Sequence, residues 1–293
     1  MDRGSLIVIF SLAALAIAIS GMLAPEDVPV VLDLTGTHRV ASLAPCITAT
    51  LRALGAEDSI ALVSDFCPDS DGLPRGGTAL APDLERILRC GARVLLVRSA
   101  TALPRSELRR VGTPVELPWS TIEEVTKSIE TIGSLVNRKQ AADDLARRMR
   151  ETLSSVPSPD APRVLLVIGD SFDEAGGLWV IKPNSIHGAV LAAAGCRNAI
   201  EKPMSGTPQL SIEGLHQIDP DIILHMIPGD DSAGRSRGDI RQDYATLKGL
   251  QAVRRATVGR VCHPRILDEG PELLELVAAI QQEVELLNRG ESR

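Results

Sequence analysis

Short runs of apolar residues alternate with helical stretches along most of the chain. The apolar runs that have the length and flanking residues of buried strands are residues 38–43, 59–63, 93–97 and 114–117. The helical stretches between them are residues 47–54 and 83–90. Alternating strands and helices predict a parallel sheet covered by helices. Residues 38–120 are therefore expected to form one α/β lobe.

A long helical stretch follows this lobe. Residues 121–154 keep a helical period with charged residues outward, and Gly133 is their only glycine or proline. Three prolines, the first at Pro157, end the period. The pattern predicts one continuous helix, assigned to residues 121–156, that joins the first lobe to a second.

The alternation restarts in the last part of the chain. Strands are predicted at residues 163–168 and 221–225, and helices at residues 185–194, 211–218 and 271–287. This indicates a second α/β lobe over residues 163–293. The fold class predicted for the chain is thus two Rossmann-like lobes with parallel sheets, joined by one long rigid helix.

The two halves share an ungapped repeat. Residues 83–87 and 93–97 match residues 211–215 and 221–225, so a capped helix and the strand after it recur at the same spacing. A duplicated lobe with its own sheet explains this. Ligands of open α/β sheets bind outside the carboxyl ends of the strands, so the expected site is the cleft between two facing lobes.

The first residues are typical of an export signal. Arg3 is followed by an apolar run over residues 6–19, interrupted only by Ser11. Small residues around position 18 suit signal peptidase, but the stretch up to Ala24 is also long enough to stay as a membrane anchor. Residues 1–24 therefore predict a periplasmic or other extracytoplasmic location, with cleavage left open.

Composition narrows the range of partners. The chain has 293 residues, of which 44% are hydrophobic and 24% charged, as in a folded protein with two cores. The net charge of −7 is spread out, and no basic stripe is interleaved with aromatic residues, so no nucleic-acid partner is expected. Aromatic residues make up only 2%. A large flat ligand would find few stacking partners.

Several short segments occur in a fixed order. They are RVASLAP at residues 39–45, LGA at 54–56, VSD at 63–65, PDLE at 82–85, LSIE at 210–213 and PDII at 220–223. Their order and spacing over residues 38–288 resemble the iron-siderophore and vitamin B12 periplasmic binding proteins, the class III substrate-binding proteins of ABC importers. The resemblance implies a monomer without an intrinsic cofactor that binds a metal chelate, such as a ferric siderophore, cobalamin or a haem-like compound.

The resemblance also implies partners, namely an ABC permease and its ATPase. In this family an acidic residue on each lobe docks onto basic pockets of the permease, and Glu85 and Glu213 match those positions. A second interpretation is that each glutamate simply lies in the first turn after an N-cap, Asp83 or Ser211, where the helix dipole favours negative charge. The two interpretations are compatible.

Candidate ligand-binding residues follow the predicted strand ends. They are Pro45, Cys46, Asp65, Phe66, Arg98, Asp170, Phe172, Trp179, His225 and Arg265. The planar guanidinium of Arg98 suits a ligand carboxylate or phosphate, although a neighbouring acid could also satisfy it. His225 is interpreted as a hydrogen-bonding residue rather than a metal ligand, and no metal site is predicted. Phe172 and Trp179 either cover a flat ligand or pack in the core.

Cys46 and Cys67 are a departure from the family pattern. Cys46 stands where the first ligand loop of the family usually carries a small polar residue, and Cys67 ends the second such loop. Three interpretations stay open: a disulfide that stiffens the cleft, soft ligands for a thiophilic metal, or plain packing.

Two other function classes have some support in the sequence. Gly169-Asp170-Ser171 imitates the nucleophile block of GDS-type esterases, but the chain lacks the late Asp-x-x-His that would orient a base, so no enzyme is predicted. A membrane-anchored sensor could use the same cleft to report a ligand instead of passing it on. An uncleaved N-terminal segment would favour the sensor.

Overall fold

The computed structural model describes residues 39–68, 72–99, 104–172, 177–230, 232 and 234–290. The predicted signal segment, residues 1–24, lies outside the described residues. In the part of the chain that is described, none of the helices combines the length and apolar character needed to cross a membrane.

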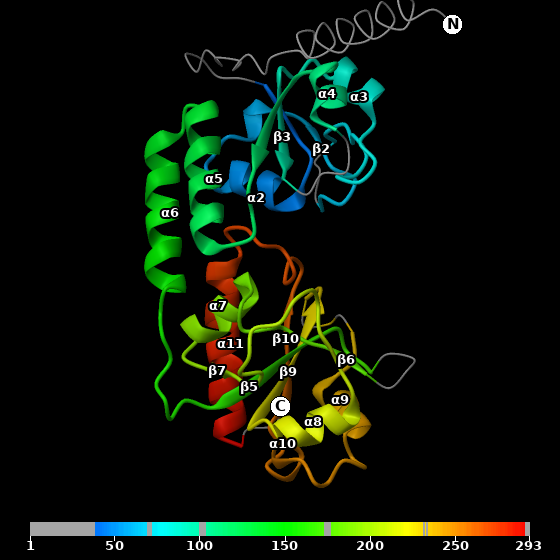
Figure 1. The fold of residues 1–293 in the computed structure, drawn as a ribbon, viewed down its shortest axis with the longest axis vertical. Helices are drawn as coiled ribbons and strands as arrows, with labels where there is room; N and C mark the ends of the chain where they lie inside the picture. The colour runs from blue at the N-terminus through cyan, green and yellow to red at the C-terminus, as the bar shows by residue number, and fades with distance from the viewer. Residues whose placement is uncertain are drawn as a thin grey trace, which may run out of the picture. The chain divides into compact units, whose positions relative to one another are not determined.

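The first lobe is built on a parallel four-stranded sheet (Figure 1). In spatial order its strands are β2 (Ile60–Val63), β1 (Val40–Ser42), β3 (Val94–Arg98) and β4 (Thr113–Leu117). Its helices are α2 (Pro45–Ala53), a 3-10 turn η1 (Glu57–Ser59), α3 (Leu84–Arg89) and α4 (Arg105–Arg109). Pro45 starts α2, where its fixed φ and missing N–H are tolerated. Leu95 and Val97 pack against Ile87 and Leu108 in the core.

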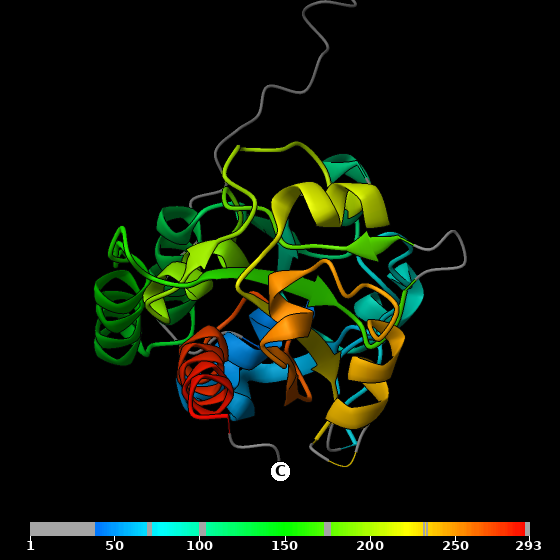
Figure 2. The same ribbon diagram turned by 90° about the horizontal axis from the view of Figure 1, so that it is seen from below.

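The second lobe has its own parallel sheet. In spatial order its strands are β10 (Val258–His263), β9 (Ile222–Pro228), β5 (Arg163–Ile168) and β7 (Arg197–Asn198). The strands β6 (Leu178–Trp179) and β8 (Gln209–Leu210) form a separate small antiparallel pair. Its helices are α7 (Ile186–Ala193), α8 (Ile212–Ile218), α9 (Arg237–Asp243), α10 (Gln251–Arg254) and α11 (Leu273–Asn288). The helix α11, seen end-on in Figure 2, packs against α7 and β10. The prediction of two lobes with separate parallel sheets is confirmed.

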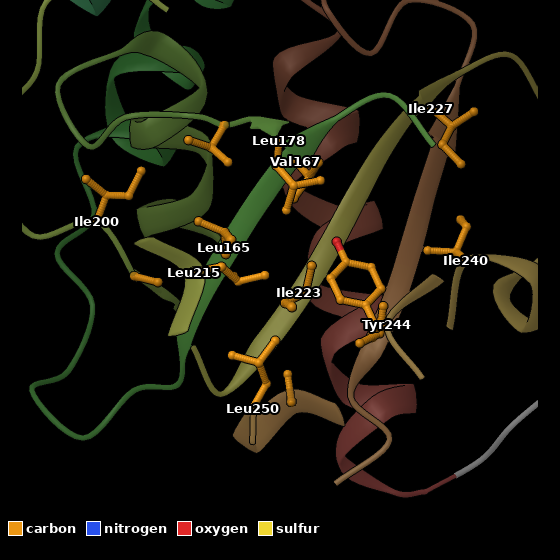
Figure 3. Packing of buried hydrophobic residues seen from close by; sticks show 14 residues of the cluster. Leu165, Val167, Leu178, Ile200, Leu215, Ile223, Ile227, Ile240, Tyr244 and Leu250 are labelled. Carbon is orange, nitrogen blue, oxygen red and sulfur yellow. The ribbon is translucent and has the colours of Figure 1, made fainter. Parts of the chain in front are cut away.

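The core of the second lobe lies between its sheet and the helices α8 to α10. Leu165, Val167 and Ile223 point from β5 and β9 into the same cluster as Leu215 and Tyr244 (Figure 3). Apart from Arg163 at the start of β5 and His225 within β9, these strands are apolar because both faces of the parallel sheet are covered.

The connector is a pair of helices, so the prediction of one continuous helix is wrong. The helices α5 (Ile122–Leu135) and α6 (Lys139–Leu153) lie side by side (Figure 1). The chain turns at Asn137, whose φ of 56° is left-handed, and the N–H of Arg138 donates to the carbonyl oxygen of Gly133 at 2.7 Å. Asparagine tolerates this conformation, and the six-to-one hydrogen bond is the usual end of a helix. The connector is anchored at both ends, because α5 contacts α2 and α6 contacts α7.

Gly133 lies at a close approach between the two connector helices. A Cβ at Gly133 would lie 2.2 Å from the Cβ of Ala142, which is far inside contact distance. We expect Gly133→Ala to reduce the free energy of unfolding by about 1–3 kcal/mol, as overpacking does. The matched control is Gly238→Ala in α9, where the nearest atom to a new Cβ is 3.6 Å away. The control should be neutral or stabilising by up to about 1 kcal/mol, through helix propensity alone. Urea denaturation of both variants checks this, and equal effects would contradict it.

Candidate functional site

A cavity of about 160 Å³ lies where the two lobes meet. The first lobe contributes the loops after β1, β2 and β3, and the second lobe contributes the loop between β10 and α11. The lining residues are Leu43, Ala44, Pro45, Cys46, Ser64, Phe66, Ala79, Arg98, Leu267, Asp268 and Glu269. Four of the predicted site residues, Pro45, Cys46, Phe66 and Arg98, are therefore brought together.

The strand order explains why the cavity forms at this place. From β1 the chain moves to β2 on one side and then returns to β3 on the other side. The loops that follow β1 and β3 therefore separate, and such a switch point leaves a crevice at the carboxyl edge of the sheet. Cys46 lies in the first turn of α2, directly after the first of these loops, and Arg98 is the last residue of β3.

Arg98 makes an ion pair across the two lobes. Its Nη2 lies 3.0 Å from Oε2 of Glu269 and 3.2 Å from the carbonyl oxygen of Trp119. The side chains of Arg98 and Glu269 are 34% and 27% exposed, so water screens the pair and its contribution to stability is about 1 kcal/mol or less. The sequence left either a ligand anion or a neighbouring acid as the partner of Arg98. In the structure the partner is an acid, Glu269, which comes from the opposite lobe and lines the same cavity.

Three further contacts hold the lobes at this point. The indole Nε1 of Trp119 donates to the carbonyl oxygen of Glu269, and Nη2 of Arg265 donates to the carbonyl oxygen of Pro45 at 3.5 Å. Gly270 packs directly on the first lobe, since a Cβ there would lie 3.4 Å from the carbonyl oxygen of Cys46. The loop between β10 and α11 is thus the principal bridge from the second lobe to the cavity.

Arg265 anchors this loop from within. Its Nε lies 2.9 Å from Oδ2 of Asp268, and its Nη1 lies 2.6 Å from Oε1 of Glu272. Burial raises the pKa of Glu272, whose Oε2 has no hydrogen-bond partner among the described residues. Because two acids of the same segment bind its guanidinium, Arg265 fixes the shape of the loop. The same guanidinium also donates to the backbone carbonyl of Pro45 in the other lobe.

The two cysteines near the cavity, Cys46 and Cys67, are both free thiols in this structure. Sγ of Cys67 lies 3.1 Å from Oγ1 of Thr48, while Cys46 faces the cavity. Two residues along a helix differ by about 200° in direction, so Thr48 and Cys46 point to opposite sides of α2. Burial raises the pKa of Cys46 to about 12 against the attraction of Arg98, so its thiol is neutral near pH 7.

Two apolar side chains lie at the mouth of the cavity. Phe66 is 69% exposed and Leu267 is 43% exposed, and they come from different lobes. The neighbouring Asp65 is not among the residues that line the cavity, and its Oδ1 accepts from the backbone N–H of Gly77 at 3.1 Å. Asp65 thereby shapes the loop that presents Phe66.

His225 and Phe172 belong to the core of the second lobe. Nδ1 of His225 lies 2.8 Å from the carbonyl oxygen of Gly169, and its Nε2 lies 2.8 Å from the hydroxyl of Tyr244. Burial lowers the pKa of His225, so the ring is neutral, with Nδ1–H as the donor and Nε2 accepting from the Tyr244 hydroxyl. The ring of Phe172 packs on Tyr244 at a centroid distance of 5.1 Å. Both nitrogens of His225 are engaged by groups other than Ser171, so the esterase hypothesis gains no base here.

Asp170 and Trp179 also lie apart from the lining of the cavity. Asp170 follows β5, and its carbonyl oxygen accepts from Arg235, which is paired with Asp243. Trp179 is a half-exposed residue of β6. Among the described residues, no group of three or more His, Cys, Asp or Glu side chains is arranged to hold a metal ion.

Glu85 and Glu213 occupy equivalent places on the two lobes. Each lies in the first turn of its helix, α3 or α8, after an N-cap side chain, Asp83 or Ser211, that accepts a backbone N–H. Both glutamates are exposed, and Glu85 pairs with Arg89 one turn later. The N-capped helices and the exposure of both glutamates are compatible with a role in permease docking and with a favourable interaction with the helix dipole.

Sequence reasoning missed Glu269, Asp268 and Leu267 as part of the site. One available signal was their place in the chain, between β10 and the predicted helix from residue 271. Residues that follow the carboxyl end of a strand are candidates for a ligand site. Trp119 was missed for another reason, because its link to Glu269 spans 150 residues.

Comparison with known proteins agrees with this geometry. A family model described as "Periplasmic binding protein" matches residues 40–260, while no curated protein matches the sequence. Among solved structures, the haem-binding protein HutB of Vibrio cholerae is 18% identical with a TM-score of 0.70, over 84% of this chain and 98% of its own. The vitamin B12 binding protein BtuF of Vibrio cholerae is 20% identical with a TM-score of 0.64, over 86% and 98%. The Fe³⁺–Desferal-bound siderophore binding protein FhuD of Vibrio cholerae is 18% identical with a TM-score of 0.66, over 86% and 99%. The chain therefore belongs to the periplasmic binding protein family, with the fold of the class III substrate-binding proteins of ABC importers.

Proposed function

We propose that this protein is the substrate-binding component of an ABC importer and that its ligand is a metal chelate. The observation that carries the proposal is the cavity between the lobes, which lies at the switch point of the first sheet and contains Arg98. Haem, vitamin B12 and Fe³⁺–Desferal, named for the three similar structures, are all metal chelates of this kind.

The size of the cavity indicates how a chelate enters. Sites for ligands of drug size have volumes of roughly 300–1,000 Å³, which is larger than the 160 Å³ present here. Either the lobes separate or only the polar end of the ligand enters. In both cases the apolar side chains of Phe66 and Leu267 at the mouth meet the body of the chelate.

The proposed location and partners follow from the N-terminal pattern and the family. Export by residues 1–24 would place the protein in the periplasm or an equivalent extracytoplasmic space. There a monomer would deliver its ligand to a permease driven by an ATPase. Glu85 and Glu213 are the proposed docking residues, one on each lobe.

Native mass spectrometry of protein purified from its own periplasm tests the proposal. We expect a species heavier than the protein alone, whose added mass and isotope pattern belong to a metal chelate. Titrations of the empty protein with haemin, cyanocobalamin and Fe³⁺–Desferal then identify the class. A retained ligand without metal, such as a peptide or a sugar, together with no binding of these three chelates, would contradict the proposal.

A further inference from the structure

Inside the cavity, the carboxylate of Glu269 forms an ion pair with the guanidinium of Arg98. Since Glu269 lies 3.0 Å from Arg98 and lines the same cavity, a ligand anion that binds Arg98 must compete with this carboxylate. Its backbone is held as well, because Trp119 donates to its carbonyl oxygen and Arg265 ties the loop to Asp268. Glu269 is therefore positioned at Arg98 by the surrounding structure.

We propose that Glu269 is a specificity-determining residue of the cleft, which holds Arg98 in the empty protein and is displaced by the anionic group of the ligand. The inference rests on the proposed function and narrows the ligand to a chelate with an accessible carboxylate or similar anion. A neutral chelate gains nothing from Arg98, because Glu269 already satisfies that side chain.

The surroundings of Glu269 also define what lies beside the anion. Once displaced, the carboxylate remains near Asp268, and the nearby Arg265 is already engaged by Asp268 and Glu272. Its lost partner must then be replaced by water or by a donor group on the ligand. A chelate that carries a hydroxyl, amide N–H or amine next to its anionic group therefore binds better than one that presents several anions together.

The test compares Glu269→Gln with Glu285→Gln, which removes the same charge from an exposed residue of α11. The probes are haemin and ferric citrate, which carry carboxylates, and Fe³⁺–Desferal, which carries neither a free carboxylate nor a phosphate. Without the competing carboxylate, Glu269→Gln should bind whichever anionic probe the wild type binds about two- to fivefold more tightly, as expected for loss of a screened ion pair. The affinity for Fe³⁺–Desferal should not increase in Glu269→Gln, and the Glu285→Gln control should change none of the affinities.

A second measurement does not need a ligand. Phenylglyoxal modifies arginines faster when no carboxylate pairs with them, and peptide mass spectrometry measures the rate at Arg98. We expect a severalfold faster reaction at Arg98 in Glu269→Gln than in the wild type or in Glu285→Gln. Arg147, an exposed residue of α6, serves as an internal control whose rate should stay constant.

A double variant shows whether the effect passes through Arg98. In an Arg98→Ala background, Glu269→Gln should no longer improve the affinity for an anionic probe. Without the guanidinium of Arg98, Glu269 and the ligand anion no longer compete for the same group. Weaker binding in Glu269→Gln, or a gain that persists without Arg98, would overturn the inference. If none of the chelates binds any variant but Arg98 still reacts faster, the proposed function fails while Glu269 still occupies Arg98. An unchanged reaction rate at Arg98 overturns the inference irrespective of the ligand.

Discussion

Replacement of both Glu85 and Glu213 by lysine is expected to abolish chelate uptake in cells and to leave the affinity of the purified protein for its ligand unchanged. Each side chain is exposed in the first turn of its helix, and the two lie on separate lobes, away from the residues that line the cavity. Two basic residues would repel the basic pockets that the family's docking mode implies. Uptake assays in a deletion strain and calorimetry on the variant provide the two measurements.

The matched control carries Glu151→Lys and Glu285→Lys, two exposed helix positions with the same total change of charge. The control should support normal uptake. Normal uptake by the folded Glu85/Glu213 variant would refute the docking role. If the strain without the protein also takes up chelate normally, the sensor is the better description of the function.

Removal of the Arg98 side chain should produce the largest loss of affinity from a single substitution. We expect Arg98→Ala to weaken the binding of an anionic chelate by about 1.5–3 kcal/mol, the range for a hydrogen bond to a charged group, or roughly ten- to 150-fold in Kd. The melting temperature of the empty protein should change little, because the ion pair to Glu269 is partly exposed.

Calorimetric titration and thermal unfolding of Arg98→Ala separate its two roles. A loss of affinity with an unchanged melting temperature assigns Arg98 to the ligand. Unchanged affinity with a clearly lowered melting temperature would show that the contact with Glu269 serves only to hold the lobes together. Arg147→Ala, at an exposed ion pair on α6, is the control for removal of an arginine.

The lobes and most of their strands were predictable from the sequence because their signals are local. In the run of residues 93–97 the four residues after Arg93 are all apolar, which suits a strand buried on both faces, and the run is observed as β3 (Val94–Arg98). The N-caps Asp83 and Ser211 were predictable for the same reason, since capping depends on residues three positions apart. The break in the connector was not predicted, because the left-handed turn at Asn137 leaves the helical period on either side undisturbed.

The sequence by itself determined two α/β lobes, their duplicated plan and a cleft site near Cys46, Phe66 and Arg98. Only the tertiary structure decided that Arg98 faces Glu269, which lies 171 residues further along the chain. It also placed His225 within β9 and Phe172 beside it in a core around Tyr244, although the sequence predicted both to lie at strand ends, as it did Arg98. The physical reason is that the periodicity of apolar residues indicates which side chains are buried. Contacts between side chains far apart in the sequence depend instead on strand order and on the packing of distant loops, and no local pattern encodes either of these.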